Sequence, residues 1–168
     1  DNPLLDRMAQ VAQGSFTHSR HVAELAYVAA KTVGANPLLA RVGAMFHDIG
    51  KSDHPEYYIE NQTEENKHDD IKPSLSVAII KSHVKLGVEK GREAGLPQEV
   101  LDIIGQHHGN DVIQFFYSEA IKEAQERSGE VNIEDYSYNN EIPQTKEAAV
   151  VMLADVVEAA TRTMKKPT

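Results

Sequence analysis

The sequence has no cysteine and no tryptophan, and its basic residues are outnumbered by its acidic ones. The lack of cysteine excludes disulfides, thiolate metal sites, iron–sulfur clusters and a cysteine nucleophile. With 17 Lys and Arg against 26 Asp and Glu, the formal net charge is −9. This balance argues against binding a nucleic-acid polymer, because no excess of positive charge is available to neutralise its phosphates. An acidic protein that acts on an anionic substrate needs a local source of positive charge, such as a metal ion.

Long apolar runs are also lacking. No stretch approaches the roughly 20 apolar residues that span a bilayer, and no signal peptide is visible. The chain starts at Asp1 rather than at a methionine, so we expect a piece of a longer protein. Its 168 residues are enough for one domain with a real core, and no internal boundary is evident. We therefore expect a single domain over residues 1–168.

Helical periodicity dominates what is present. Apolar residues recur every three to four positions, whereas clear period-2 alternation is lacking. This pattern predicts an all-α bundle of about six helices or more. Two polar segments, 52–72 and 128–143, interrupt the pattern and are interpreted as loops; a loop of the first one's length is often functional. The predicted helices cover residues 18–33, 36–46, 73–94, 97–108, 112–126 and 146–164.

Several of the eight histidines stand where a plain core would have an aliphatic residue. His18 and His83 fall on the apolar faces of their helices, and His107 and His108 end an apolar helix. Asp155 lies within an apolar helix, where a carboxylate without a partner is costly. Each signal alone has a plainer explanation, such as a hydrogen-bonded core histidine or a pair that complements a helix dipole. Their occurrence together in one chain indicates a metal site.

Imidazole and carboxylate groups, without thiolates, suit Fe, Mn, Zn, Co or Ni better than a structural zinc site. The candidates outnumber the ligands of one tetrahedral ion, which favours two ions bridged by a carboxylate. His21 is kept as a supporting or structural residue, and His54 falls in the polar loop. The seven candidate ligands are His18, His47, Asp48, His83, His107, His108 and Asp155.

The order of these residues, together with HDIGK at 47–51, resembles the HD-domain metal phosphohydrolase superfamily. More narrowly, the stretches GANPLLARVGAMFHDIGK at 34–51, PEYYIENQ at 55–62 and KEAAVVMLADVVEAATRT at 146–163 resemble the cytoplasmic HD domain of the seven-transmembrane HD proteins, the PgpH-type cyclic di-AMP phosphodiesterases. Thr17 stands where that family usually has a further histidine, but the ligand His18 is kept.

The resemblance implies an HD-domain helical bundle with a dinuclear metal site in its core. One ion would be held by His18, His47, Asp48 and Asp155. The second would be held by Asp48, His83, His107 and His108, with Asp48 bridging. The family suggests Fe or Mn for both ions.

The reaction implied is hydrolysis of cyclic di-AMP to linear pApA through a metal-bridging hydroxide. Asp48 and Lys51 are the expected catalytic residues. By their position after the HD motif and in the polar loop, the expected substrate contacts are Lys51, Asn61, Gln62, Asn66 and His68. The resemblance also implies a cytoplasmic domain of a membrane-anchored bacterial protein, with a homodimer left open.

Three other functions stay open at this point: a phosphohydrolase of another cyclic dinucleotide or nucleotide, a noncatalytic nucleotide sensor, and a dinuclear-iron oxygenase. Sensors of this kind usually lose ligands, whereas here all seven positions are filled. Oxygen-dependent turnover would support the oxygenase.

Overall fold

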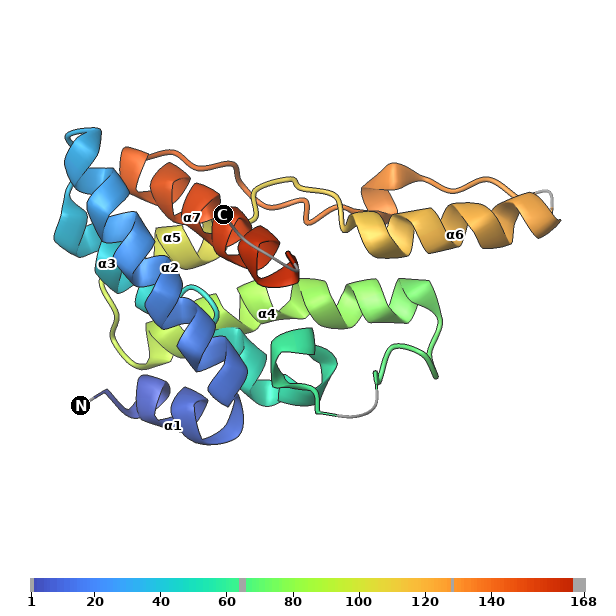
Figure 1. Ribbon diagram of the computed structural model, residues 1–168, viewed down its shortest axis with the longest axis horizontal. Coiled ribbons are helices and arrows are strands. Elements are labelled where there is room, and N and C mark those ends of the chain that lie inside the picture. The colour runs from blue at the N-terminus through green and yellow to red at the C-terminus, as the bar shows by residue number, and fades with distance from the viewer. Residues whose placement is uncertain (1, 64–65, 128, 165–168) are drawn as a thin grey trace.

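The chain folds into a helical bundle with an extended arm, shown in Figure 1 as a computed structural model. The structure describes residues 2–63, 66–127 and 129–164. Within these ranges the regular structure is helical, apart from an isolated antiparallel bridge between Val112 and Ser137. The prediction of an all-α fold is therefore confirmed. The α-helices are α1 (Pro3–Val11), α2 (Gln13–Thr32), α3 (Pro37–Phe46), α4 (Pro73–Glu93), α5 (Gln98–Gln106), α6 (Gln114–Arg127) and α7 (Lys146–Thr163).

Polar side chains cap the starts of three helices. The Asn2 side chain accepts a hydrogen bond from the backbone N–H of Leu4 at the start of α1, and Asn36 caps α3 in the same way, ahead of Pro37. The Thr145 hydroxyl accepts from the backbone N–H of Ala148 in α7. These contacts satisfy N–H groups that have no partner within the first helical turn, so they fix where each helix begins.

Two apolar clusters hold the bundle together. The larger one packs α2, α3, α5 and α7 around small side chains, among them Ala26, Ala44 and Ala154, which let the helices approach closely. The smaller one seats α1 against the end of α3 and the face of α5, with Met8 and Ile49 fully buried. The functional residues lie where these packed helices end or cross.

Helix α6 and the first half of α4 extend away from the bundle. Figure 1 shows α6 reaching out beside α4, with the chain then returning to α7. Four short 3-10 turns complete the described structure: η1 (Ile49–Asp53), η2 (Pro55–Tyr57), η3 (Ile59–Asn61) and η4 (Ile133–Tyr136). No described helix is both long and apolar enough to cross a bilayer.

Two expectations need correction. Helix α1 was not predicted, although its cap and its apolar residues Leu4, Leu5 and Met8 follow a helical spacing. The segment 52–72 was expected to be an irregular loop, but much of its first half is ordered into 3-10 turns. The amide of Asn61 holds this part against α2: it accepts from the Ser15 N–H and donates to the Pro55 carbonyl.

Candidate metal centre and active site

The seven residues predicted as metal ligands lie together in the interior, although they come from five helices or helix ends. His18 is on α2, Asp155 on α7 and His83 on α4. The other four stand just after helices: His47 and Asp48 follow α3, and His107 and His108 follow α5. The structure thus brings the whole predicted set to one place.

The turn after α3 positions Asp48. A Cβ atom built on Gly50 would lie 1.9 Å from the carbonyl oxygen of His83 and 2.7 Å from the nitrogen of Gly87, so no residue with a side chain fits there. Glycine allows the turn to lie directly against α4. The glycine of the HDIGK motif therefore brings Asp48 beside His83.

Asp48 stands between two groups of side chains, one facing each of its oxygens. Its Oδ1 lies 3.4 Å from His83 Nε2 and 3.8 Å from His107 Nε2. Its Oδ2 lies 3.2 Å from His47 Nε2 and 3.7 Å from His18 Nε2. We refer to His83, His107 and His108 as the α4 side, and to His18, His47 and Asp155 as the α2 side.

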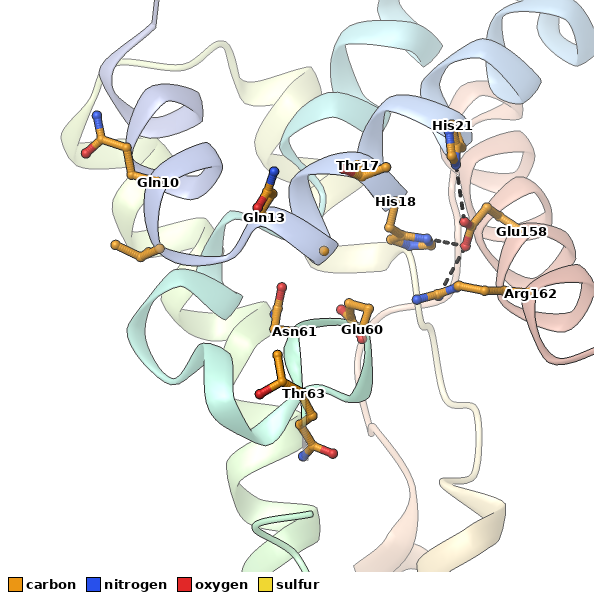
Figure 2. A pocket seen from close by; sticks show the side chains of 13 residues that line it. Gln10, Gln13, Thr17, His18, His21, Glu60, Asn61, Thr63, Glu158 and Arg162 are labelled. Atoms are coloured by element: carbon orange, nitrogen blue, oxygen red, sulfur yellow. Dashed lines mark hydrogen bonds and ion pairs between the residues drawn. The ribbon is translucent and has the colours of Figure 1, made fainter. Parts of the chain in front are cut away.

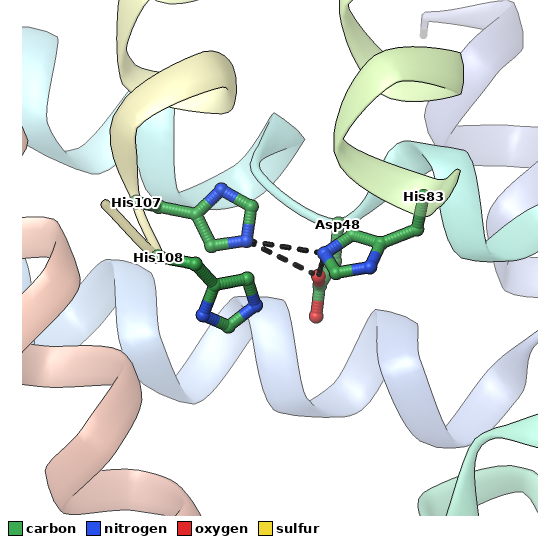
Figure 3. A group of neighbouring side chains, drawn as sticks. All are labelled: Asp48, His83, His107 and His108. Carbon is green, nitrogen blue, oxygen red and sulfur yellow. Dashed lines mark hydrogen bonds and ion pairs between the residues drawn. The ribbon is translucent and has the colours of Figure 1, made fainter. Parts of the chain in front are cut away.

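On the α4 side, the rings are fixed by backbone carbonyls. His83 Nδ1 donates to Ile80 O at 2.6 Å, and His107 Nδ1 donates to Ile104 O at 2.7 Å. With Nδ1 protonated in a neutral ring, each Nε2 carries a lone pair directed into the cluster. The two Nε2 atoms are only 3.3 Å apart, and Figure 3 shows both beside Asp48. A cation bound between the two nitrogens would satisfy both lone pairs.

Burial keeps these rings neutral. It lowers the pKa of His83 to about 4 and that of His107 to about 3, and it also lowers the pKa of His108. At neutral pH the three imidazoles are therefore unprotonated at one nitrogen, the form that binds metals.

The α2 side is held by carboxylates. His18 Nε2 lies 2.9 Å from Asp155 Oδ1, and His47 Nδ1 donates to Ala44 O at 2.6 Å. Burial opposes protonation of His47, but the carboxylate of Asp48 raises its pKa to about 9. Although burial acts in the opposite direction, the hydrogen bond from His18 and the charge of His47 hold the pKa of Asp155 below its usual range.

Several buried atoms of the cluster lack a hydrogen bond, although Lys51 forms an ion pair with Asp48 Oδ2. Within the described residues, His47 Nε2 and both carboxylate oxygens of Asp48 have no hydrogen bond of acceptable geometry. Buried polar groups normally have hydrogen-bond partners, so these atoms leave room for a further partner besides Lys51. Divalent cations are the partners that this set of imidazole nitrogens and carboxylate oxygens fits. The cluster around Asp48 is thus suited to bind a divalent metal ion. Which of its residues bind the ion stays a prediction.

Lys51 lies at the edge of the cluster. Its Nζ is 2.8 Å from Asp48 Oδ2 and 2.9 Å from Glu60 Oε1. Burial works against its charge, yet these carboxylates raise its pKa well above the usual value. Lys51 Nζ also lies 5.1 Å from the centre of the Tyr58 ring, which adds a cation–π contact. The Lys51 side chain therefore stays positively charged beside the side chains that surround Asp48.

A cavity of about 630 Å³ opens onto the cluster, a volume in the range of small-molecule sites. His18, Lys51 and His108 form part of its wall beside the cluster. The rest of the wall combines aromatic and amide side chains with aliphatic ones. The aromatic and amide residues are Tyr57, Tyr58, Phe115, Phe116, Tyr138, Gln62, Asn66 and His68, and the aliphatic ones are Ile59, Ile80, Val156 and Ala159.

The predicted substrate contacts differ in their placement. Lys51, Gln62, Asn66 and His68 line this cavity. Asn61 does not: it lines a neighbouring cavity, and its amide is engaged with Ser15 and Pro55. Asn61 belongs to the segment that lines the cavity, but its side chain is turned toward Ser15 of α2 and the Pro55 carbonyl.

Three polar residues of the site were not predicted. Glu60 pairs with Lys51, and although burial opposes ionisation, this pairing lowers the pKa of Glu60 to about 2. Tyr138 stacks on His108, with ring centres 4.1 Å apart and planes tilted by 19°. Glu158 hydrogen-bonds His18. Of the three, Glu158 carried a usable signal, because it follows Asp155 by three residues and so lies on the same face of α7.

The HD-domain family profile matches residues 15–160. This chain belongs to the HD-domain family. The HD domain is 44% identical to the cyclic-di-AMP phosphodiesterase PgpH of Bacillus subtilis over 168 residues, and 43% identical to PgpH of Listeria monocytogenes over 169 residues. It spans only 23% of the length of each of these relatives, although 99% and 100% of the chain aligns.

Solved structures agree with this assignment. The HD domain of L. monocytogenes PgpH in complex with cyclic di-AMP superposes on this HD domain with a TM-score of 0.95, at 43% identity. The alignment covers 100% of this chain and 77% of the other. The predicted HD fold is therefore confirmed.

Proposed function

We propose that this HD domain is a metal-dependent phosphodiesterase that hydrolyses cyclic di-AMP to linear pApA. The observation that carries the proposal is the cavity that opens onto the Asp48 cluster, in a fold that superposes on an HD domain solved with cyclic di-AMP. The assignment of a cyclic dinucleotide also fits the mixture of aromatic rings, amides and one buried cation in the cavity wall.

We assign two divalent ions, Fe or Mn, to the two sides of Asp48. One set of ligands is His18, His47, Asp48 and Asp155; the other is Asp48, His83, His107 and His108. Three groups of donor atoms lie close enough to hold an ion. Two of them contain Asp48, one with His18 and His47 and one with His83, His107 and His108, which supports its sharing; the third joins His47, His107 and Asp155. Such ions supply Lewis acidity and an activated water-derived nucleophile at neutral pH.

The chain's own residues then bind and orient the substrate. The ammonium of Lys51 faces the cavity beside the cluster and is placed to contact a phosphate oxygen, offsetting the charge that develops there. Hydrolysis adds the elements of water across one phosphodiester: a new P–O bond forms, the bond from phosphorus to the ribose 3′ oxygen breaks, and that oxygen takes up a proton.

The outer wall is suited to adenine. The Tyr57, His68 and Phe116 rings lie edge to face, with centres 5.5 Å apart between Tyr57 and His68 and 5.0 Å apart between His68 and Phe116. His68 Nε2 contacts the Tyr57 carbonyl at 2.7 Å, while its buried Nδ1 lacks a hydrogen-bond partner among the described residues. We assign this aromatic group and the amides of Gln62 and Asn66 to the base or ribose.

The test is hydrolysis of cyclic di-AMP and cyclic di-GMP by the purified domain, followed by chromatography, with metal content measured in parallel. We expect Mn²⁺ or Fe²⁺ to support cleavage of cyclic di-AMP to pApA, and EDTA to abolish it. Two bound ions without cleavage of either nucleotide would contradict the proposal and favour a sensor or an oxygenase. Preferred cleavage of cyclic di-GMP would contradict the substrate assignment alone.

We further propose that residues 1–168 form one domain of a longer, membrane-anchored bacterial protein and that this domain faces the cytoplasm. The basis is the small share of the PgpH relatives that the chain spans. A homodimer is the assembly to test, by light scattering of the domain with and without cyclic di-AMP; a monomer in both samples would contradict it.

A further inference from the structure

His18 is held differently from its neighbours in the cluster. His47, His83 and His107 each direct Nδ1 at the carbonyl of the residue three positions earlier. His18 instead directs Nδ1 at the carboxylate of Glu158, one turn beyond Asp155 on α7. Glu158 thus lies behind His18, on the side away from Asp48.

Glu158 is itself held in place. Arg162 Nη2 lies 3.1 Å from the same carboxylate oxygen that His18 contacts, and His21 Nδ1 lies 3.5 Å from the other oxygen. Figure 2 shows the three side chains converging on Glu158 at the wall of a second cavity of about 580 Å³. Glu158 is buried, with 8% of the residue exposed, so these contacts rather than water fix the orientation of its carboxylate.

The contact between α2 and α7 does not depend on Glu158. These helices pack through buried aliphatic side chains, including Val22 and Ala26 on α2 and Val151 and Ala154 on α7. Burying a carboxylate where apolar packing already suffices costs stability. A functional role for Glu158 accounts for this cost.

We infer that Glu158, held by Arg162, is a positioning residue that fixes the ring of His18 and strengthens its Nε2 as a metal ligand. A carboxylate that accepts the other ring N–H of a ligand histidine sets the tautomer and raises the basicity of the metal-binding nitrogen more than a neutral carbonyl does. The two ion positions therefore differ, with the α2 side depending on Glu158 and the α4 side independent of it. The inference rests on the metal centre of the proposed function.

The test is a calorimetric titration of the metal-free domain with Mn²⁺, without nucleotide, for the wild type and Glu158→Gln. Variants His18→Ala and His83→Ala identify which binding step belongs to which side. We expect Glu158→Gln to weaken the step that His18→Ala abolishes by about 10- to 100-fold, the usual effect of losing such a partner. The step that His83→Ala abolishes should change little.

Two variants serve as controls. Glu93→Gln removes the same charge at the exposed end of α4 and should leave both steps unchanged. Arg162→Gln keeps the carboxylate but removes its guanidinium partner, and should weaken the same step as Glu158→Gln by a smaller factor. This second variant keeps the test decisive if Glu158→Gln does not fold.

Unchanged steps in Glu158→Gln, or equal weakening of both, would overturn the inference. Failure of the proposed function is distinguishable from this outcome. A wild type that binds two ions but cleaves no cyclic di-AMP refutes the substrate while leaving the role of Glu158 open to this titration. A wild type with no second Mn²⁺ step refutes the two-ion centre and the inference with it.

Discussion

The two sides of the Asp48 carboxylate both carry buried histidines but stabilise different protonation states. On the α4 side, backbone carbonyls fix His83 and His107, and burial lowers the pKa of both rings. On the α2 side, carboxylates surround the rings, and Asp48 raises the pKa of His47 despite equal burial. Asp48 lies 3.2 Å from His47 Nε2 and 3.4 Å from His83 Nε2, so contact with a carboxylate does not by itself decide the state of a buried histidine. At His83, burial together with the positive charges of Lys51 and His47 outweighs the carboxylate.

Removing Asp48 should break both sides at once and have the largest effect. Asp48→Ala takes away the carboxylate that both donor groups share. We expect turnover of cyclic di-AMP to fall about a thousandfold or more, because the charge stabilisation at the reacting phosphate is lost. Steady-state kinetics and metal analysis measure this, with Glu93→Gln as the matched charge control. Turnover near the wild-type level would show that Asp48 is dispensable for the reaction.

Removing the metal should lower the free energy of unfolding, because the buried atoms of Asp48 and His47 lose the ion that they would bind. A ligand that binds only the folded state at a hundred times its dissociation constant adds about 2.7 kcal/mol to the free energy of unfolding for each site. Urea unfolding with excess Mn²⁺ and with EDTA measures the difference. Equal stability in the two conditions would mean that Asp48 and His47 find other partners when metal is absent.

Changing pH should separate the two sides in the metal-free domain. The folded pKa values of His83 and His107, about 4 and about 3, lie below the unfolded value of 6.5. Their contribution to stability is therefore complete above pH 6.5 and is lost as pH falls, by about 1.4 kcal/mol per pH unit for each ring.

His47 should act in the opposite direction. Its folded pKa of about 9 lies above 6.5, so its contribution is complete below pH 6.5 and is lost as pH rises toward 9. Urea unfolding in EDTA across pH 5 to 9 measures how the free energy of unfolding changes on both sides of pH 6.5. His107→Gln should reduce the dependence on pH below 6.5 and leave the dependence above it unchanged. A stability that stays level on the acid side would contradict the neutral state assigned to the α4 side.

The smallest effect is expected outside the cluster, at the cavity wall. His68→Ala removes a ring that lines the cavity and contacts Tyr57 and Phe116. We expect KM for cyclic di-AMP to rise several-fold, since a stacking contact is worth about 1 kcal/mol, while kcat changes little. Asn61→Ala provides the contrast, because its amide secures the backbone and should affect stability more than KM. A fall in kcat alone for His68→Ala would place His68 in the chemistry instead.

The sequence located the residues of the Asp48 cluster better than the wall of the site, for a physical reason. His18, His83 and Asp155 stand on apolar helix faces, where helical spacing alone shows that a polar side chain points inward. Helix α1 carries the same kind of spacing in Leu4 and Met8, but its nine residues are too few for that spacing to stand out.

The wall depends on contacts between distant segments. Tyr138 reaches His108 from a segment without regular spacing, and Glu60 reaches Lys51 from a 3-10 turn. The orientation of Asn61 is likewise set by Ser15, 46 residues earlier. No local pattern carries such information, so these placements required the tertiary structure.

The bare α-carbon of Gly50 has a consequence for variation in the motif. A single methyl group there would act as a wedge between the turn and the backbone of α4, since it meets the His83 carbonyl and the Gly87 nitrogen rather than a flexible side chain. Gly50→Ala would therefore force Asp48 and His83 apart without changing any donor atom. The smallest residue of HDIGK thus sets the spacing on which its aspartate and a histidine 35 positions after it can act as one chelate.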